Sequence, residues 1–142
     1  MGIVVSINTS EYTGVIKKPV KEATFLEGGI QQDAHFGKSE IKQVSLLAEE
    51  SIDKLRAMGM ELNPGMFAEN ITTEGIELHT LPVGTRLRIG ETIQEVSQIG
   101  KECHTGCAIK QTTGTCVMPT EGIFTRVIKG GIVRPGDPIE IQ

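Results

Sequence analysis

The chain has 142 residues, 38% of them hydrophobic, and a net charge of −4 at pH 7. This length predicts a single domain over residues 1–142, because domains typically hold ~100–200 residues. The acidic balance disfavours nucleic acid as the main partner. The amino end shows neither a signal-peptide pattern nor a membrane span, so we expect a cytoplasmic protein.

The first half of the chain alternates short β-type segments with turns. We predict strands over residues 2–8, 20–26 and 41–47, with a polar loop after the second one. Residues 48–58 predict a helix, because Ile52, Leu55 and Met58 recur at helical spacing and a glycine follows.

The second half predicts more strands and one more helix. Residues 66–73 end in a strand-like run, and residues 85–89 and 92–99 form a hairpin around a Gly-Glu turn. We predict a helix after Pro119, with Phe124, Val127 and Ile128 on one face, and a last strand over residues 139–141. Without βαβ alternation or repeats, this pattern indicates a mainly β barrel or sandwich with two helices.

All three cysteines lie in one segment that follows a predicted strand. They are Cys103, Cys107 and Cys116, an odd number that suits a disulfide framework poorly. Lys101 and His104 lie beside the first of them, and a nearby lysine favours the thiolate that binds soft metals or carries sulfur. The alternative is that these cysteines are small buried hydrophobic residues.

A zinc site is an alternative function for this segment. It would use the three cysteines and one histidine, either His104 or His35, but structural zinc sites normally have two close cysteine or histidine pairs and only one is present.

Two further polar residues are candidates for binding. His35 follows Asp33, a carboxylate that would orient the imidazole ring of a base or ligand, although a solvated loop histidine is an equal alternative. The Asn70 amide suits pairing with a heterocycle, but asparagine beside a turn often bonds its own backbone.

Several spaced motifs together resemble the MOSC domain, named for the C-terminal domain of molybdenum cofactor sulfurases. They are residues 64–71 (PGMFAENI), residues 81–85 (LPVGT), residues 96–98 (VSQ) ahead of the cysteines, and glycine pairs near the end. Residues 33–35, 43–47 and 116–119 look most like the small stand-alone bacterial members.

The resemblance implies a β-barrel-like domain with two or more short helices that binds the molybdenum or tungsten pyranopterin cofactor. Cys103 matches the family cysteine that ligates the metal or carries sulfur, and Cys107 is the alternative because it precedes an aliphatic pair. The arginine that some members carry before this cysteine is absent, and Lys101 is the expected substitute.

The cofactor's two other ends have candidate contacts as well. The backbone N–H groups of a helix start near Ala48 suit its phosphate, and the side chains of Asn70 and His35 suit its pterin edge, in one cleft with Cys103. His104 is also expected to bind the cofactor. No pyridoxal phosphate is expected, since the fused sulfurases carry it on a separate domain.

The sequence leaves three functions open. The first is a protein that binds the cofactor and transfers sulfur or cofactor to a molybdoenzyme or cofactor-biosynthesis partner. The second is a small molybdenum-dependent reductase of N-hydroxylated compounds, and the third is a non-catalytic zinc-binding β-domain. The first two make the protein a sulfur transferase or an oxidoreductase.

Overall fold

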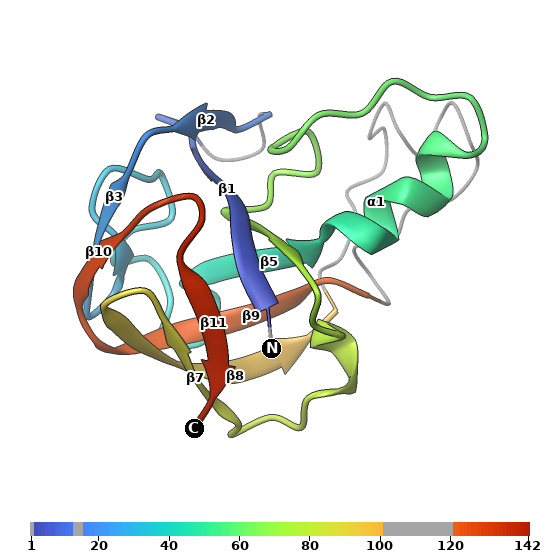
Figure 1. Cartoon of the computed structure of the whole chain (residues 1–142). Coiled ribbons are helices and arrows are strands. Elements are labelled where there is room, and N and C mark those ends of the chain that lie inside the picture. Colours follow the sequence, from blue (N-terminus) through green and yellow to red (C-terminus); the bar gives the residue numbers. More distant parts are fainter. Residues whose placement is uncertain (1, 13–15, 101–120) are drawn as a thin grey trace.

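A computed structural model describes residues 2–12, 16–100 and 121–142. Within these residues seven strands form a closed barrel in the order β11-β7-β8-β9-β5-β6-β1, and β11 pairs with β1 to close it (Figure 1). They are β1 (Gly2–Thr9), β5 (Val44–Ala48), β6 (Ile71–Glu74), β7 (Arg86–Ile89), β8 (Thr92–Ile99), β9 (Ile123–Lys129) and β11 (Pro138–Ile141).

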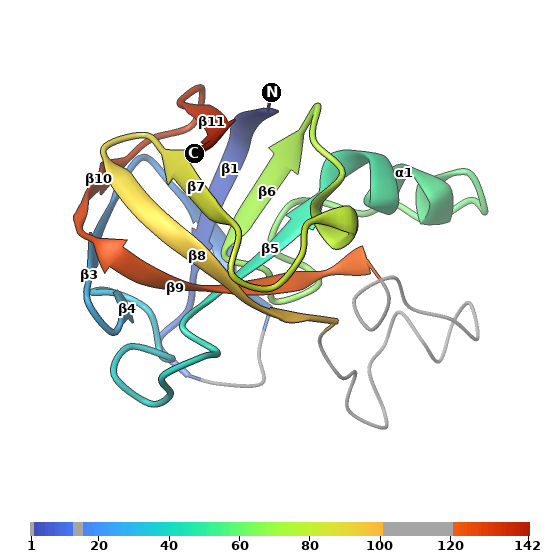
Figure 2. The same ribbon diagram turned by 90° about the horizontal axis from the view of Figure 1, so that it is seen from below.

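Smaller elements complete the fold around this barrel. A strand pairs with the far half of β1, a second sheet has the order β10-β3-β4, and a helix lies outside the barrel (Figure 2). These elements are β2 (Lys18–Val20), β3 (Ala23–Leu26), β4 (Gly29–Ile30), the helix α1 (Glu49–Arg56), the 3-10 helix η1 (Leu78–Thr80) and β10 (Gly131–Val133).

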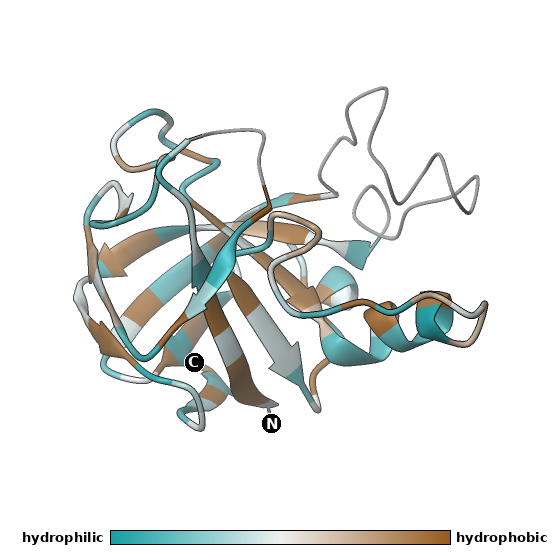
Figure 3. Cartoon of the chain, turned by 90° about the horizontal axis from the view of Figure 1, so that it is seen from above, coloured by the Kyte–Doolittle hydropathy of each residue, from teal (hydrophilic) through white to brown (hydrophobic). Residues whose placement is uncertain are grey.

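Aliphatic side chains fill the inside of the barrel. In β7, Leu87 and Ile89 are fully buried while Arg86 and Arg88 are exposed, so the predicted alternation is confirmed. The hydropathy colouring shows similar alternation along other strands (Figure 3). The interior core draws on every barrel strand; among its fully buried members are Ile7, Leu46, Ile71, Leu87, Ile89, Val96, Ile123 and Ile139.

The central strand β5 is buried on both faces. Leu46 faces the barrel core, whereas Leu47 packs with Ile52, Leu55 and Phe67 in a second cluster beneath α1. The parallel pairing of β5 with β6 makes β5-α1-β6 a βαβ unit. The expectation that the chain has no such unit is therefore wrong.

The helix α1 follows the sequence prediction closely. Acidic residues occupy its first turn and basic residues its last turn, which complements the helix dipole. The chain then leaves the helix through Gly59, whose φ of +97° is easily reached only by glycine.

The helix predicted after Pro119 is wrong, because residues 123–129 form the strand β9. Ile123, Thr125 and Val127 alternate toward the barrel interior, and Phe124 is also buried. The other face of β9 combines the buried Phe124 and the half-buried Ile128 with the exposed Arg126, so the alternation is incomplete and the spacing of the apolar residues resembled a helical face.

Other differences concern boundaries. The segment predicted as one strand over residues 20–26 is divided between β2 and β3, and β5 begins three residues later than expected. The short strand β10 was not predicted, whereas the hairpin of β7 and β8 is confirmed. Across the described residues, no helix has the length and apolar character that a membrane crossing requires.

Truncation of the barrel core tests this packing. Leu46→Ala should lower the free energy of unfolding by about 2–5 kcal/mol, because it leaves a cavity at a fully buried position. Leu26→Ala is the matched control at a side chain that is 39% exposed, and it should cost much less. Urea unfolding measures both, and equal losses would contradict the described core.

Candidate functional site

Gly100 and Gly122, which lie on either side of the cysteine-bearing segment in the sequence, are neighbours at one place of the barrel. The N–H of Gly100 donates a hydrogen bond to the carbonyl oxygen of Gly122 at 2.7 Å, directly beyond the last pair of β8 and β9, Ile99 with Ile123. The described residues on either side of residues 101–120 are thus joined at the end of the β8–β9 pair. The predicted site residues Lys101, Cys103, His104 and Cys107 lie outside the described residues, as does Cys116.

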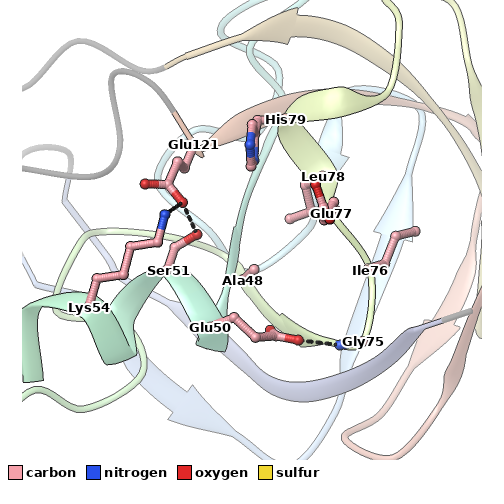
Figure 4. Close-up of a pocket in the computed structure, with 10 residues that line it drawn as sticks. All are labelled: Ala48, Glu50, Ser51, Lys54, Gly75, Ile76, Glu77, Leu78, His79 and Glu121. Atoms are coloured by element: carbon pink, nitrogen blue, oxygen red, sulfur yellow. Dashed lines mark hydrogen bonds and ion pairs between the residues drawn. The ribbon is translucent and has the colours of Figure 1, made fainter. Parts of the chain in front are cut away.

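A pocket of about 560 Å³ lies where β5 passes into α1, next to the returning end of that segment (Figure 4). Glu121, two residues before β9, contributes to it, and one of its oxygens accepts bonds from Lys54 Nζ and Ser51 Oγ, both at 2.8 Å. Its lining is Ala48, Glu50, Ser51, Lys54, Gly75, Ile76, Glu77, Leu78, His79 and Glu121.

The charges of this pocket favour cations. Glu50, Glu77 and Glu121 contribute three carboxylates, against a single lysine. Partial burial would raise the pKa of Glu121, but the bonds from Lys54 and Ser51 outweigh it and lower this pKa below its usual value. The carboxylate of Glu121 is therefore expected to be ionised at neutral pH.

This charge balance bears on the phosphate contact expected at Ala48. Ala48 precedes α1 as expected. Its side chain forms no capping hydrogen bond, so the free N–H groups of the first helical turn have no acceptor from this residue. Glu49 and Glu50 follow it directly, and phosphate would meet their negative charge. The described residues here do not fit a phosphate well, and the contact stays a prediction.

His35 belongs to a cluster of ionisable groups near the end of β1. Its Nδ1 lies 3.1 Å from Asp33 Oδ2, as their closeness in sequence suggested. Asp33 Oδ1 accepts a bond from Lys17 Nζ at 2.7 Å, and both of these side chains are only 1% exposed. Burial opposes the ionisation of Asp33, but the bonds from His35 and Lys17 prevail and hold its pKa well below the usual range.

Lys17 is a member of this cluster that sequence reasoning missed. It precedes another lysine in a polar stretch, and nothing in that pattern signals a buried ammonium. Its backbone is held by Gly65, whose carbonyl oxygen accepts the Lys17 N–H at 2.9 Å. A Cβ atom at Gly65 would lie 2.2 Å from the carbonyl oxygen of Lys17, so this close approach requires glycine.

Asn70 is buried, and both ends of its amide bond within the protein. Its Oδ1 accepts bonds from the backbone N–H of Ser45 at 3.0 Å and from the Ser45 hydroxyl at 3.2 Å. Its Nδ2 donates to the carbonyl oxygen of Asn8 at 3.1 Å. These bonds tie β5 to β1, which is a structural role; a pterin contact by this amide stays a prediction.

Glu69, the neighbour of Asn70, is a second buried group that sequence reasoning missed. Its Oε2 accepts a bond from the Thr72 hydroxyl at 2.7 Å and its Oε1 accepts the Phe67 N–H at 3.2 Å. Burial is the main cause that raises the pKa of this carboxyl above its usual value. The adjacent Ala68 adopts a φ of +59°, which is uncommon outside glycine and places this turn around the carboxylate.

The expected site residues gather at two places. Asn70 and the cluster of His35 both contact the end of β1. Asn70 forms hydrogen bonds with Asn8 in β1, and Asp33 accepts a hydrogen bond from the N–H of Ser10, just after β1. Ala48 lies toward the other end of the β5–β6 pair, three residues along the strand from Ser45, or roughly 10 Å. The cleft predicted for Asn70, His35 and Cys103 is not tested, because Cys103 lies outside the described residues.

The described residues contain no candidate metal site made from their side chains alone. Within residues 2–12, 16–100 and 121–142, no three histidine, cysteine, aspartate or glutamate side chains are grouped to hold an ion. The zinc alternative depends on the cysteines, which this observation does not cover.

Removal of the Asn70 amide tests its structural role. Asn70→Ala should lower the free energy of unfolding by about 1–3 kcal/mol, because it leaves the buried N–H of Ser45 and carbonyl of Asn8 without their partner. Asn63→Ala, at an exposed position, is the control. A loss no larger than that of the control in urea unfolding would show that these bonds contribute little.

The buried carboxyl of Glu69 predicts a pH dependence of stability. Its folded-state pKa lies above the ordinary 4.5, so its contribution is fully present at lower pH and is lost as the pH rises above that value. The stability of the wild type relative to Glu69→Gln should therefore fall between about pH 4.5 and neutral pH. Unfolding curves across this interval measure the difference, and a rise would contradict the prediction.

Comparison with known proteins supports the fold and the family. A profile of the MOSC domain matches residues 31–140. The fold resembles the YUAD protein from Bacillus subtilis, with a TM-score of 0.78, 19% identity and coverage of 99% of this chain and 96% of that one. YiiM from Geobacillus stearothermophilus gives a TM-score of 0.77 and 21% identity, covering 100% of this chain and 75% of that one.

YiiM from Escherichia coli is also similar, with a TM-score of 0.67 and 24% identity over 100% of this chain and 70% of that one. At these identities the likenesses show the fold alone, and no curated protein matches the sequence significantly. The family follows from the sequence profile, which spans most of the barrel and the whole cysteine segment. The chain belongs to the MOSC domain family.

Proposed function

We propose that this protein carries sulfur on Cys103 and handles the molybdenum or tungsten pyranopterin as its cargo. One observation supports the proposal: in a chain of the MOSC family, the described residues on either side of the segment with all three cysteines are joined at the barrel by the Gly100–Gly122 bond. Reactive groups commonly lie on loops that a rigid scaffold positions.

The chemistry of a thiol fits this role. A thiolate attacks the terminal sulfur of a donor persulfide, a sulfur–sulfur bond forms on the cysteine, and the donor leaves as a thiolate. The same thiolate is the soft ligand that a soft metal centre prefers. Lys101, two residues before Cys103 in the sequence, favours the thiolate form, and we propose that His104 contacts the cargo as well.

We propose further contacts with the cargo from the described residues. His35, whose side chain is 29% exposed, contacts the pterin edge, whereas the amide of Asn70 would have to exchange existing bonds to do so. The carboxylates around Ala48 disfavour a phosphate, so the proposal needs no phosphate contact there. The donor and acceptor of sulfur would be molybdoenzymes or cofactor-biosynthesis proteins in the cytoplasm.

The pocket beside α1 favours one alternative function. Its three carboxylates, Glu50, Glu77 and Glu121, suit a positively charged organic base. An N-hydroxylated base that carries a positive charge would be such a ligand, and N-hydroxylated compounds are the substrates of the molybdenum-dependent reductase considered above. An assay for reduction of such a base, with a supplied electron donor, separates the reductase from a sulfur carrier.

Substitution of the cysteines tests the proposal. Cys103→Ala should abolish persulfide formation and cofactor retention without a large change in melting temperature, because the thiol is the reacting group. Cys116→Ala is the matched control and should retain both properties. Persulfide-specific labelling followed by mass spectrometry of the peptides measures the first property, and metal analysis measures the second.

The outcomes of this experiment differ in meaning. Loss in Cys107→Ala but not in Cys103→Ala would move the role to Cys107. Full persulfide formation and full cofactor loading in both variants would contradict any role of these thiols.

A further inference from the structure

The cluster of Lys17, Asp33 and His35 joins segments that are distant in the sequence. Lys17 precedes β2, whereas Asp33 and His35 follow β4. Lys17 Nζ lies 2.7 Å from Asp33 Oδ1, 3.0 Å from Ser10 Oγ and 3.4 Å from His35 Nδ1. Burial of an unpaired charge is costly, and here the ammonium and the carboxylate compensate each other.

Both oxygens of Asp33 are committed by this arrangement. Oδ1 accepts from Lys17 Nζ and from the Ser10 N–H, the latter at 3.1 Å. Oδ2 accepts from the backbone N–H of His35 and faces its Nδ1, each at 3.1 Å. The carboxylate therefore cannot turn without loss of several bonds, and it presents a fixed negative oxygen to the imidazole ring.

This fixed oxygen determines which ring nitrogen of neutral His35 carries the proton. Nδ1 lies closer to the carboxylate oxygen than to the ammonium of Lys17, whose shortest bond is to the other oxygen of Asp33. The proton is therefore favoured on Nδ1, and the lone pair is left on Nε2. The imidazole side chain is 29% exposed, while the side chains of Lys17 and Asp33 are buried.

We infer that Lys17 and Asp33 are positioning residues that hold His35 as the Nδ1–H tautomer, so that Nε2 accepts a hydrogen bond from a bound ligand. Within residues 2–12, 16–100 and 121–142 no residue bonds Nε2, and the His35 side chain is 29% exposed. The ligand class is a heterocycle with an N–H edge, and the choice of the pterin rests on the function proposed above. The tautomer itself does not depend on that function.

The first test measures the tautomer in the ligand-free protein. In the wild type, nitrogen NMR of the neutral form of the ring should show Nδ1 protonated and Nε2 unprotonated, with His35→Gln to assign the signals. In Asp33→Asn, Lys17 and Ser10 keep the amide oxygen on their side. The amide NH₂ then faces Nδ1, and the proton should move to Nε2.

Asp53→Asn is the matched control, since it makes the same change on the exposed side of α1 and should leave the signals of His35 unchanged. A merely structural role for the cluster predicts no such switch. An Nε2–H tautomer in the wild type would overturn the inference. If Asp33→Asn fails to fold, the wild-type spectrum alone still decides it.

The second test measures binding of the metal-free pyranopterin. His35→Ala should weaken binding about tenfold or more, whereas His79→Ala, in the pocket beside α1, should not. Wild-type binding that His35→Ala leaves unchanged would overturn the ligand contact while the proposed function stands. If the wild type does not bind the pyranopterin, both the proposed function and this contact are contradicted. The first test would still determine the tautomer.

Discussion

Closure of the barrel through β1 is the constraint on which the rest of this structure depends. One end of β1 pairs with β11, and its length pairs with β6. This closure removes the free sheet edges that would otherwise expose unpaired backbone groups. It also brings the two ends of the chain together (Figure 1) and fixes the position of residues 8–10, to which the buried polar groups attach.

Those polar groups give the end of β1 a different character from the rest of the core. Lys17, Asp33, Glu69 and Asn70 are all buried, and their side chains bond to each other or to the backbone. Each would be costly to bury alone, and together they hold irregular segments against the barrel. In this part of the chain the side chain of His35 is 29% exposed beside the buried Asp33, whereas the pocket beside α1 is lined by three carboxylates.

The sequence predicted the parts of the fold that follow a simple periodicity. The alternation of Leu87 and Ile89 with arginines predicted the β7–β8 hairpin, and helical spacing with flanking charges predicted α1. The strand β9 was missed because its outer face carries Phe124 and Ile128 beside the exposed Arg126, so the alternation of apolar and polar residues is incomplete.

The site was harder to predict than the fold. The pairing of His35 with Asp33 was visible because the two residues are close in the sequence. The burial of Lys17 depends on a contact between distant segments, and its sequence neighbourhood resembles any exposed basic stretch. The negative pocket was missed for the same reason, since Glu50, Glu77 and Glu121 come from three separate segments.

The central claim is that this MOSC domain uses a cysteine to handle sulfur or a molybdenum or tungsten pterin. It is tested most directly by elemental analysis and intact mass spectrometry of the wild-type protein, purified without oxygen from cells supplied with both metals. The account predicts bound molybdenum or tungsten with pterin, or a protein mass increased by one sulfur atom. One equivalent of zinc, with no added sulfur and no pterin, would contradict it.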